Sequence, residues 1–540
     1  MKYIHRFLIF TIFLVLICFN NSHLAYSINN TITDYNFDEW YYFNDKDFLS
    51  QNYGIIDNKI SQYIVSTGEG SISIPIDFKG NYGIYVSIIG DSSEFIVSTT
   101  NNKFIVDPRT EFFSRNRNKN TLKELFISNI SLDNEDKIEI IFNSPNAKLV
   151  NLRLLKLTDE EYTQWLAPES NNKNFLFDND LYTDFFQGEN SSYNMFKYNT
   201  IEQYENLSVN ILNYCVGTTF FPFYNSSYAG EPYGSFNKYK NAVRVGDITA
   251  YNDFMNLYNT YGDPIKIISS SEKTFDLFLT FRMNSFLPND YRGFLNGNIY
   301  NDFSSKTQKF NHKISFYYED YREYLLNIIL ESTEKFHPKG ITLDFSRTPN
   351  FFGYELLNRN ARKKILSEFV KTIREEVPDD IKIMVRFPYN YTNYDLDVPL
   401  WISEAYVDYI SPTSLKYEEF FDITPFVEMV KDSSVKLYPS ITSNLGGEDL
   451  DINSEKSYQN KGLFGINNEY LSVSDYLLRA IELYEKGAHG VLLFNVNTQI
   501  GEPALIPTKL KLLNGVDSLE KWYYFEYLLE SKDKEIKFID

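Results

Sequence analysis

The spacing of hydrophobic and polar positions changes at about residue 157. Before that point, short runs alternate apolar and polar residues and are bounded by Gly, Asn, Asp and Ser, without helical spacing between them. Such runs are typical of strands joined by hairpins, and over residues 28–157 they predict an antiparallel β-sandwich of the jelly-roll kind. The runs that carry this prediction are residues 71–76, 82–89, 94–97, 137–142 and 149–154.

Strand and helix patterns alternate after a polar stretch at residues 158–173, which we interpret as a linker. Eight apolar runs of strand length follow, at residues 175–178, 210–217, 277–282, 341–345, 381–386, 407–411, 435–440 and 490–495. Stretches with helical spacing lie between and after them, at residues 202–207, 251–271, 320–336, 355–376, 398–405, 417–431, 473–486 and 507–513. The alternation indicates βα units and a parallel sheet.

Eight βα units are the number with which a TIM barrel closes. We therefore predict a (β/α)8 barrel over residues 174–520 and a C-terminal tail over residues 521–540. An open doubly wound sheet fits the same local pattern, but no glycine-rich phosphate loop opens any of the helical stretches.

The fourth barrel run, at residues 340–347, combines a buried-strand pattern with candidate chemistry. Ile341 and Leu343 alternate with Thr342, and the run ends in Asp344 and Arg347 before Thr348-Pro349 breaks it. In a TIM barrel the carboxyl ends of the strands face the functional site. We therefore expect Asp344 to lie there.

Residues 1–27 have the features of a signal peptide. Lys2 and Arg6 precede an apolar stretch at residues 7–19, and Ala25-Tyr26-Ser27 has small residues at the spacing of a cleavage site. We expect a secreted, periplasmic or cell-surface protein with no integral membrane span after cleavage. An uncleaved anchor is the alternative, although the apolar stretch is shorter than the ~20 residues of a span. Leu16-Ile17 before Cys18 is a poor match to a lipoprotein cleavage box.

Composition favours a neutral partner. The net charge is −20, and loss of Lys2 and Arg6 with the leader makes it −22, which argues against nucleic acid and anionic membranes. Cys215 is the one cysteine left after cleavage, so no intramolecular disulfide is expected. The aromatic fraction of 17% fits stacking on sugar rings, but the excess of Tyr and Phe is equally typical of a coding bias.

Several segments together carry a resemblance to a known family. They are Thr280-Phe281-Arg282-Met283-Asn284, the pattern Gly-x-x-Leu-Asp-Phe-x-Arg at residues 340–347, Val385-Arg386-Phe387-Pro388, Leu396-Asp397 with Trp401, and Gly487-Ala488-His489-Gly490 with Phe494-Asn495. They resemble the glycosyl hydrolase-like TIM-barrel proteins of secreted bacterial systems over roughly residues 174–520. The resemblance implies a barrel and a carbohydrate substrate. The first domain is similar to galactose-binding-like sandwiches, although a structural or surface sandwich fits its pattern as well.

Hydrolysis of a glycosidic bond normally needs two carboxyls. Asp344 is the first candidate, and an arginine beside it would suit a nucleophile or stabiliser better than a proton donor. The second is Asp178, at the end of the first strand, or Glu448, in the loop after strand seven. The related family tends to carry an acid near the end of strand seven, where this chain has Ser440-Ile441-Thr442-Ser443. That departure favours the alternative that the barrel only binds a glycan.

Other polar or aromatic residues near strand ends are candidates for binding substrate. Arg282 and Arg386 would clamp a carboxylate or hydroxyls of a sugar, or else form ion pairs inside the barrel with Asp344. Trp401 would stack on a sugar or pack in the core. The complete set of substrate-binding candidates is Arg282, Asn284, Arg347, Arg386, Asn495 and Trp401.

No metal or cofactor is expected from the sequence. His312 and His489 are not part of a ligand-spaced cluster, and Asp451, Asn453 and Glu455 lack the glycine and terminal glutamate of a calcium loop. Gly-x-Ser-x-Gly does not occur, which removes the commonest esterase class. Two hypotheses remain: an exported glycoside hydrolase-like enzyme that uses Asp344, and a non-catalytic surface glycan-binding protein on the same barrel.

Overall fold

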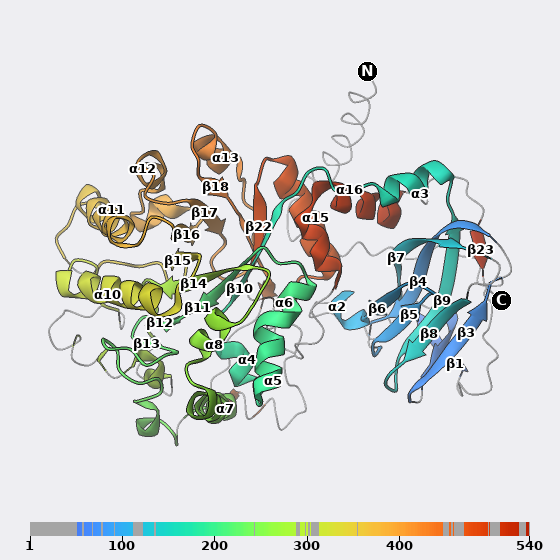
Figure 1. Cartoon of the computed structure of the whole chain (residues 1–540), viewed down its shortest axis with the longest axis horizontal. Coiled ribbons are helices and arrows are strands. Elements are labelled where there is room, and N and C mark those ends of the chain that lie inside the picture. Colours follow the sequence, from blue (N-terminus) through green and yellow to red (C-terminus); the bar gives the residue numbers. More distant parts are fainter. Residues whose placement is uncertain are drawn as a thin grey trace. The chain divides into compact units, whose positions relative to one another are not determined.

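A computed structural model describes most of the chain after residue 50 (Figure 1). The described residues are 51–56, 59–66, 68–76, 79–90, 92–111, 122–133, 137–241, 243–287, 292–297, 299–300, 303, 313–353, 355–446, 453–454, 457, 469–494, 496, 508–528 and 536–538. The predicted leader and the candidates Glu448 and Asn495 lie outside this set.

Two antiparallel sheets form the first part of the described chain. One contains, in spatial order, β1 (Gln51–Ile56), β2 (Lys59–Val65), β9 (Lys148–Lys156), β4 (Gly80–Ile89) and β7 (Leu122–Leu132). The other contains β3 (Gly70–Pro75), β8 (Lys137–Phe142), β5 (Phe95–Ser98) and β6 (Lys103–Val106). Ile84 and Val86 of β4 share one buried cluster with Ile72 of β3 and Ile140 of β8, so the sheets pack as a sandwich. The predicted all-β sandwich is confirmed.

The C-terminal residues also contribute to this sandwich. Strand β23 (Ile536–Phe538) pairs antiparallel with β9, next to Arg153, Leu154 and Leu155. The sequence interpretation treated residues 521–540 as a tail, because three residues of strand carry too little periodicity to predict a partner so distant in the chain.

The second part of the chain contains the predicted parallel sheet. Its strands are β10 (Asn174–Asn179), β11 (Ile211–Cys215), β14 (Asp276–Arg282), β15 (Gly340–Asp344), β16 (Lys382–Pro388), β17 (Tyr409–Thr413), β18 (Lys436–Leu437), β19 (Ser440–Thr442) and β22 (Gly490–Phe494). Neighbouring strands pair in parallel in the order β18-β17-β16-β15-β14-β11-β10-β22-β19. Each of the eight predicted runs overlaps one of these strands, or the β18 and β19 pair.

The two ends of that order belong to one strand, and this closes the barrel. β18 pairs with β17, and β19 pairs with β22, and only Tyr438-Pro439 separates them in the chain. Tyr438 donates its N–H to the carbonyl of Ile410 on one side, and the carbonyl of Pro439 accepts from the N–H of Leu492 on the other. The seventh strand is therefore continuous across the closure, and the sheet is an eight-stranded TIM barrel.

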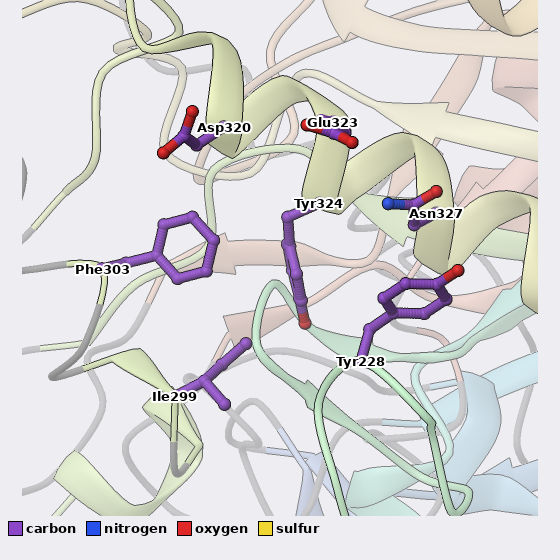
Figure 2. Close-up of a pocket in the computed structure, with 7 residues that line it drawn as sticks. All are labelled: Tyr228, Ile299, Phe303, Asp320, Glu323, Tyr324 and Asn327. Atoms are coloured by element: carbon purple, nitrogen blue, oxygen red, sulfur yellow. The ribbon is translucent and has the colours of Figure 1, made fainter.

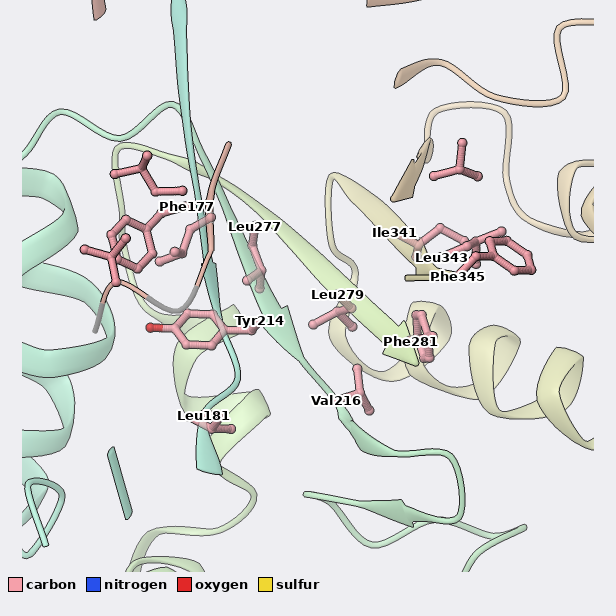
Figure 3. Packing of buried hydrophobic residues seen from close by; sticks show 14 of the residues in the cluster. Phe177, Leu181, Tyr214, Val216, Leu277, Leu279, Phe281, Ile341, Leu343 and Phe345 are labelled. Carbon is pink, nitrogen blue, oxygen red and sulfur yellow. The ribbon is translucent and has the colours of Figure 1, made fainter. Parts of the chain in front are cut away.

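Side chains alternate between the two faces of the barrel strands. Outward residues such as Phe177, Leu279 and Leu343 pack in the largest buried cluster, which includes residues of the surrounding helices (Figure 3). Inward residues form a separate small cluster of Leu176, Ile211, Phe278, Met384, Tyr438, Leu492 and Phe494. Gly340 sits against this cluster, because a Cβ there would lie 2.3 Å from the Phe278 ring. Apolar residues on both faces explain why these strands appear in the sequence as apolar runs.

Helices flank the barrel strands (Figure 1). They include α4 (Tyr182–Phe186), α5 (Tyr193–Lys197), α6 (Gln203–Asn206), α7 (Val245–Tyr261), α8 (Pro264–Ser270), α10 (Glu319–Phe336), α11 (Arg359–Glu376), α12 (Val398–Ser403), α13 (Thr424–Val430), α15 (Val473–Glu485) and α16 (Val516–Tyr523). The helix expected at 251–271 is two helices, since Gly262, with a φ of 95°, ends α7 and Pro264 begins α8. The stretch 507–513 is the 3-10 helix η8 (Thr508–Asn514).

Two further differences concern the predicted linker and the sixth helix. Helix α3 (Asp159–Leu166) occupies half of the polar stretch 158–173, and its first residues are held by a capping box between Thr158 and Glu161. Helix α13 begins at Thr424, seven residues later than the predicted start at 417, with Pro425 in its first turn. The segment before α13 is not helical, and its Glu418 side chain reaches the N–H of Thr442 in the barrel.

Candidate functional site

Polar side chains converge inside the carboxyl end of the barrel, which we call the mouth. Strand register places Arg282, Asp344 and Arg386 beside one another on β14, β15 and β16. All three are largely buried, with Asp344 and Arg386 each only 2% exposed. Two strand positions nearer the other end, the inward residues are Thr280, Thr342 and Met384, so charge is confined to the mouth.

The carboxylate of Asp344 is held by its own loop and by one guanidinium. Its Oδ1 accepts hydrogen bonds from the backbone N–H of Ser346, at 2.8 Å, and from the Ser346 hydroxyl, at 2.5 Å. The backbone N–H of Arg347 also approaches Oδ1, at 3.3 Å. On the other side, Oδ2 lies 3.4 Å from Nη1 of Arg386. The Asp344 carboxyl group is therefore held in place by four donors.

Arg386 binds protein groups on both sides of the mouth. Its Nη1 donates to the Ser346 hydroxyl at 2.7 Å, its Nη2 to Thr413 Oγ1 at 3.2 Å, and its Nε to Ser440 Oγ at 3.3 Å. The guanidinium carbon also lies 3.6 Å from the centre of the Phe494 ring, which is a close cation–π contact. Arg386 thus connects strands four, five, six, seven and eight.

Asp178 projects from the first strand into the same mouth. It is 3% exposed, and the Thr280 hydroxyl donates to its Oδ2 at 3.5 Å. Burial raises the pKa of Asp178 to about 7, the charges of Asp344 and Asp180 add to the rise, and Arg386 and Arg282 oppose it. Asp178 and Asp344 are therefore close enough to interact electrostatically, although they lie on the first and fourth strands.

The charges of the mouth explain why Asp178 takes up a proton so readily. Arg386 pairs with Asp344, and Nη2 of Arg282 lies 3.7 Å from Oδ2 of Asp180. These two cations and two anions balance, so a negative charge on Asp178 has no counter-ion of its own inside a buried site. The neutral carboxylic acid is the form that burial favours.

The remaining predicted binding residues fall into different places. Asn284 is buried, and its Nδ2 donates to the carbonyl of Asn350, so it ties two loops together. Arg347 has an exposed side chain next to the mouth. Trp401 is 0% exposed on α12, with its indole N–H donating to Ser367 Oγ at 2.9 Å. For Trp401 the geometry favours the core-packing interpretation over sugar stacking.

Two residues of the mouth region were missed in the sequence. Ser346 was overlooked because a serine between Phe345 and Arg347 has no distinctive pattern. Glu418 lies in the stretch predicted as helix, but it follows strand six in a loop and accepts the N–H of Thr442 at 2.7 Å. Burial raises the pKa of Glu418 to about 7, against the opposing charge of Arg479 and the Thr442 hydrogen bond. It is an acid beside strand seven, supplied by the neighbouring loop.

Neither a metal cluster nor a membrane-spanning helix is found within the described ranges. Among these residues, no three His, Cys, Asp or Glu side chains are grouped so that they could hold a metal ion. Likewise, no helix in the described part of the chain combines the length and the apolar character needed to cross a membrane.

The fold and the mouth define a TIM-barrel protein with a buried cluster of acids and guanidiniums. No family model matches the chain, and no curated protein matches it. Among solved structures, a chitinase from Bacteroides thetaiotaomicron is 11% identical, with a TM-score of 0.34, over 65% of this chain and 97% of that protein.

Two other solved structures give similar values. The GH18 chitinase ChiB from Flavobacterium johnsoniae is 11% identical, with a TM-score of 0.33, over 66% of this chain and 96% of that one. A beta-N-acetylhexosaminidase from Bacteroides fragilis is 10% identical, with a TM-score of 0.35, over 65% of each chain.

Proposed function

We propose that this chain is an exported glycoside hydrolase-like protein that binds a glycan at the barrel mouth and cleaves a glycosidic bond there. The observation that carries the proposal is the convergence of Asp178 and Asp344, with Arg282 and Arg386, inside the carboxyl end of a closed TIM barrel. Paired carboxyls in different environments are the arrangement that glycosidic hydrolysis uses. Export rests on the leader pattern at residues 1–27.

The surroundings of the two carboxyls support different roles. Burial raises the pKa of Asp178 to about 7, so this carboxyl keeps its proton to a higher pH than an ordinary aspartate, which suits a donor of a proton to the leaving oxygen. Asp344 is paired with Arg386 and accepts a hydrogen bond from the Ser346 hydroxyl, an arrangement that suits a group that stabilises the positive charge developing on the sugar ring or attacks it.

One observation favours the alternative of a non-catalytic glycan-binding barrel. Asp344 is 2% exposed, and both of its oxygens already have protein partners. A carboxylate of this kind also serves to fix the ends of β15 and β16, with no part in chemistry. The two functions differ in whether a bond is broken.

Wild-type protein, Asp344→Asn and Asp178→Asn would be compared on a panel of polysaccharides and oligosaccharides. Released reducing ends report cleavage, and calorimetry reports binding. We expect release to fall at least a hundredfold in both variants while binding persists. Asp379→Asn, an exposed carboxylate just before the amino end of β16 and so at the opposite end of that strand from the mouth, serves as the matched control.

The outcomes separate the two functions. Binding without release by the wild-type protein would support the glycan-binding alternative and exclude the enzyme. Release that survives in Asp344→Asn and Asp178→Asn would place the chemistry elsewhere.

A further inference from the structure

A cavity lies against helix α10. It has a volume of about 330 Å³ and is lined by Tyr228, Ile299, Phe303, Asp320, Glu323, Tyr324 and Asn327. Figure 2 shows Asp320, Glu323 and Asn327 along one helix, with the Tyr324 ring between those of Phe303 and Tyr228. The wall opposite the helix comes from the loops that follow strands two and three, which are loops of the functional face of a TIM barrel.

Tyr228 is exposed but is carried by a firmly held loop. Its side chain is 46% exposed, while the N–H groups of Tyr228 and Ala229 both donate to Ser226 Oγ at 3.1 Å. The backbones of Ser226 and Gly230 are joined by two hydrogen bonds, of 3.1 and 2.8 Å. An aromatic ring that is both exposed and fixed in place loses little entropy when a ligand stacks on it.

Glu331 of helix α10 anchors that loop to the helix. Its carboxylate accepts from the Ser226 hydroxyl at 2.6 Å, the Tyr224 hydroxyl at 2.9 Å and the Ser227 N–H at 2.7 Å, and it lies 3.2 Å from Lys335 Nζ. Glu331 is 9% exposed, so its charge is used within the protein. The Tyr228 ring therefore lies across the cavity from Asp320, Glu323 and Asn327, which precede Glu331 on α10.

The polar groups that face the cavity are uncommitted. Within the described part of the chain, the side chains of Asp320, Glu323 and Asn327 and the hydroxyl of Tyr228 form no hydrogen bond or ion pair. Glu331, farther along α10, is by contrast paired with Lys335. Two unpaired carboxylates beside three aromatic rings make a concave, negatively charged and partly apolar surface.

We propose that this cavity is a second ligand site, which takes an amine-bearing sugar unit of a glycan. The ammonium group lies between Asp320 and Glu323, the apolar face of the pyranose packs on the Tyr228 ring, and Asn327 bonds a ring hydroxyl. The proposal rests on the proposed function in one respect, namely that the ligand is a glycan.

The lining distinguishes this ligand from simpler ones. A neutral sugar would cover two carboxylates without balancing their charge, which costs desolvation energy. A small cation alone would leave most of the 330 Å³ and the aromatic walls unused. An ammonium on a sugar ring satisfies both the carboxylates and the rings, and cations are favoured over aromatic faces.

The test measures binding of short glucosamine oligomers, their N-acetylated counterparts and glucose oligomers to the full-length exported protein. Calorimetry is done where the sugar amine is protonated. We expect the glucosamine oligomers to bind at least about tenfold more tightly than the other two, because only they carry the charge. Asp320→Asn with Glu323→Gln should remove this preference, and Tyr228→Ala should weaken glucosamine binding about fivefold.

Matched controls are available in the chain. Glu334→Gln neutralises an exposed carboxylate of the same helix that does not line the cavity, and Tyr261→Ala removes a tyrosine that is 54% exposed elsewhere. Both should bind like the wild type. Equal affinity for the three oligomers, or a preference unchanged by the cavity variants, would overturn the proposal, and so would full competition by methylammonium at similar concentration.

Failure of the proposed function is recognised separately. Asp344→Asn keeps the α10 cavity intact, so glucosamine binding to this variant should equal that of the wild type even if no glycan is cleaved. Loss of binding in Asp344→Asn together with normal binding in the cavity variants would assign the amine preference to the mouth and contradict the second site.

Discussion

The guanidinium of Arg386 has protein partners at all three of its nitrogens, within a barrel mouth where nearly every charge is buried. A guanidinium with these contacts holds the strand ends together rather than binding a ligand. Its role could not be predicted from the sequence, because the partners Ser346, Thr413 and Ser440 come from three other strands or their loops. What the sequence did predict is that Arg386 and Asp344 would lie together, since both end neighbouring apolar runs.

Replacement of Arg386 should therefore be costly. Arg386→Met leaves Asp344 as a buried anion without its cation, and we expect the free energy of unfolding to fall by roughly 3–5 kcal/mol. Urea denaturation measures the change. Arg359→Met, which breaks an ion pair of a half-exposed arginine with Asp395, should cost less than about 1 kcal/mol. Similar losses in both variants would contradict a special role for Arg386.

Asp178 should make stability depend on pH. Its pKa is about 7 in the folded chain against an ordinary value of 3.8, so the folded state holds the proton more tightly. The stability that this group contributes is complete below about pH 4 and is lost as the pH rises to about 7. Asp178→Asn is neutral throughout, so it should exceed the wild type by on the order of 2 kcal/mol at pH 8.

Thermal unfolding at pH 4 and pH 8 tests this expectation. The advantage of Asp178→Asn should shrink or reverse at pH 4, where the wild-type carboxyl is neutral as well. Asp379→Asn, at an exposed position, should differ from the wild type equally at both values. A variant less stable than the wild type at pH 8 would show that Asp178 is stabilised as an anion.

At the scale of elements, the strands were predictable and the connections were not. Because barrel strands are packed on both faces, they stand out in the sequence as short apolar runs, and Ile341 and Leu343 belong to one of these. The stretch 417–431 was predicted as one helix, but the helix begins only at Thr424, because the apolar residues of this stretch suit either a helix or a covered loop. The hydrogen bond from the Thr442 N–H to Glu418 favours the loop, and it links segments that sequence periodicity cannot relate.

Strand β15 provides a test of packing inside the barrel. A Cβ on Gly340 would lie 2.3 Å from the Phe278 ring and 2.7 Å from the Lys382 carbonyl oxygen. Gly340→Ala should therefore lower the free energy of unfolding by about 1–3 kcal/mol, since an inward methyl group overfills the core. Gly68→Ala, where a Cβ would meet nothing within 4 Å, is the control for added side-chain volume. No measurable loss in Gly340→Ala would mean that Phe278 moves freely.

At the scale of the whole molecule, the predicted order of a β-sandwich followed by a closed barrel agrees with the structure. Strand β23 could not be predicted, because its pairing with β9 joins the end of the chain to the N-terminal sandwich. The candidate site was predictable in part: Asp344, Asp178, Arg282 and Arg386 meet at the mouth, whereas Trp401 lies in the core. The sequence around a tryptophan does not show whether its ring stacks on a sugar or packs in the core.

Export is the prediction that belongs to this scale. Expression of the full chain in a bacterial host should yield protein outside the cytoplasm that begins at Ile28, because residues 1–27 have the pattern of a cleaved leader. Mass spectrometry of the recovered protein measures the first residue. A chain with Met1 intact and bound to the membrane would instead support the uncleaved anchor, and replacement of Ala25 by a bulky residue provides the matching block of cleavage.

The join at Tyr438-Pro439 affects where the barrel opens locally. Pro439 has no amide hydrogen, and a few residues later the Thr442 amide is held by a carboxylate where a strand carbonyl would otherwise accept it. The ladder therefore lacks two backbone donors in this strand. In native-state hydrogen exchange, amides of residues 440–442 should be less protected than those of residues 341–344, and the protection factor of the Thr442 amide should fall further as Glu418 gains its proton. Local opening of the barrel would then begin beside the mouth.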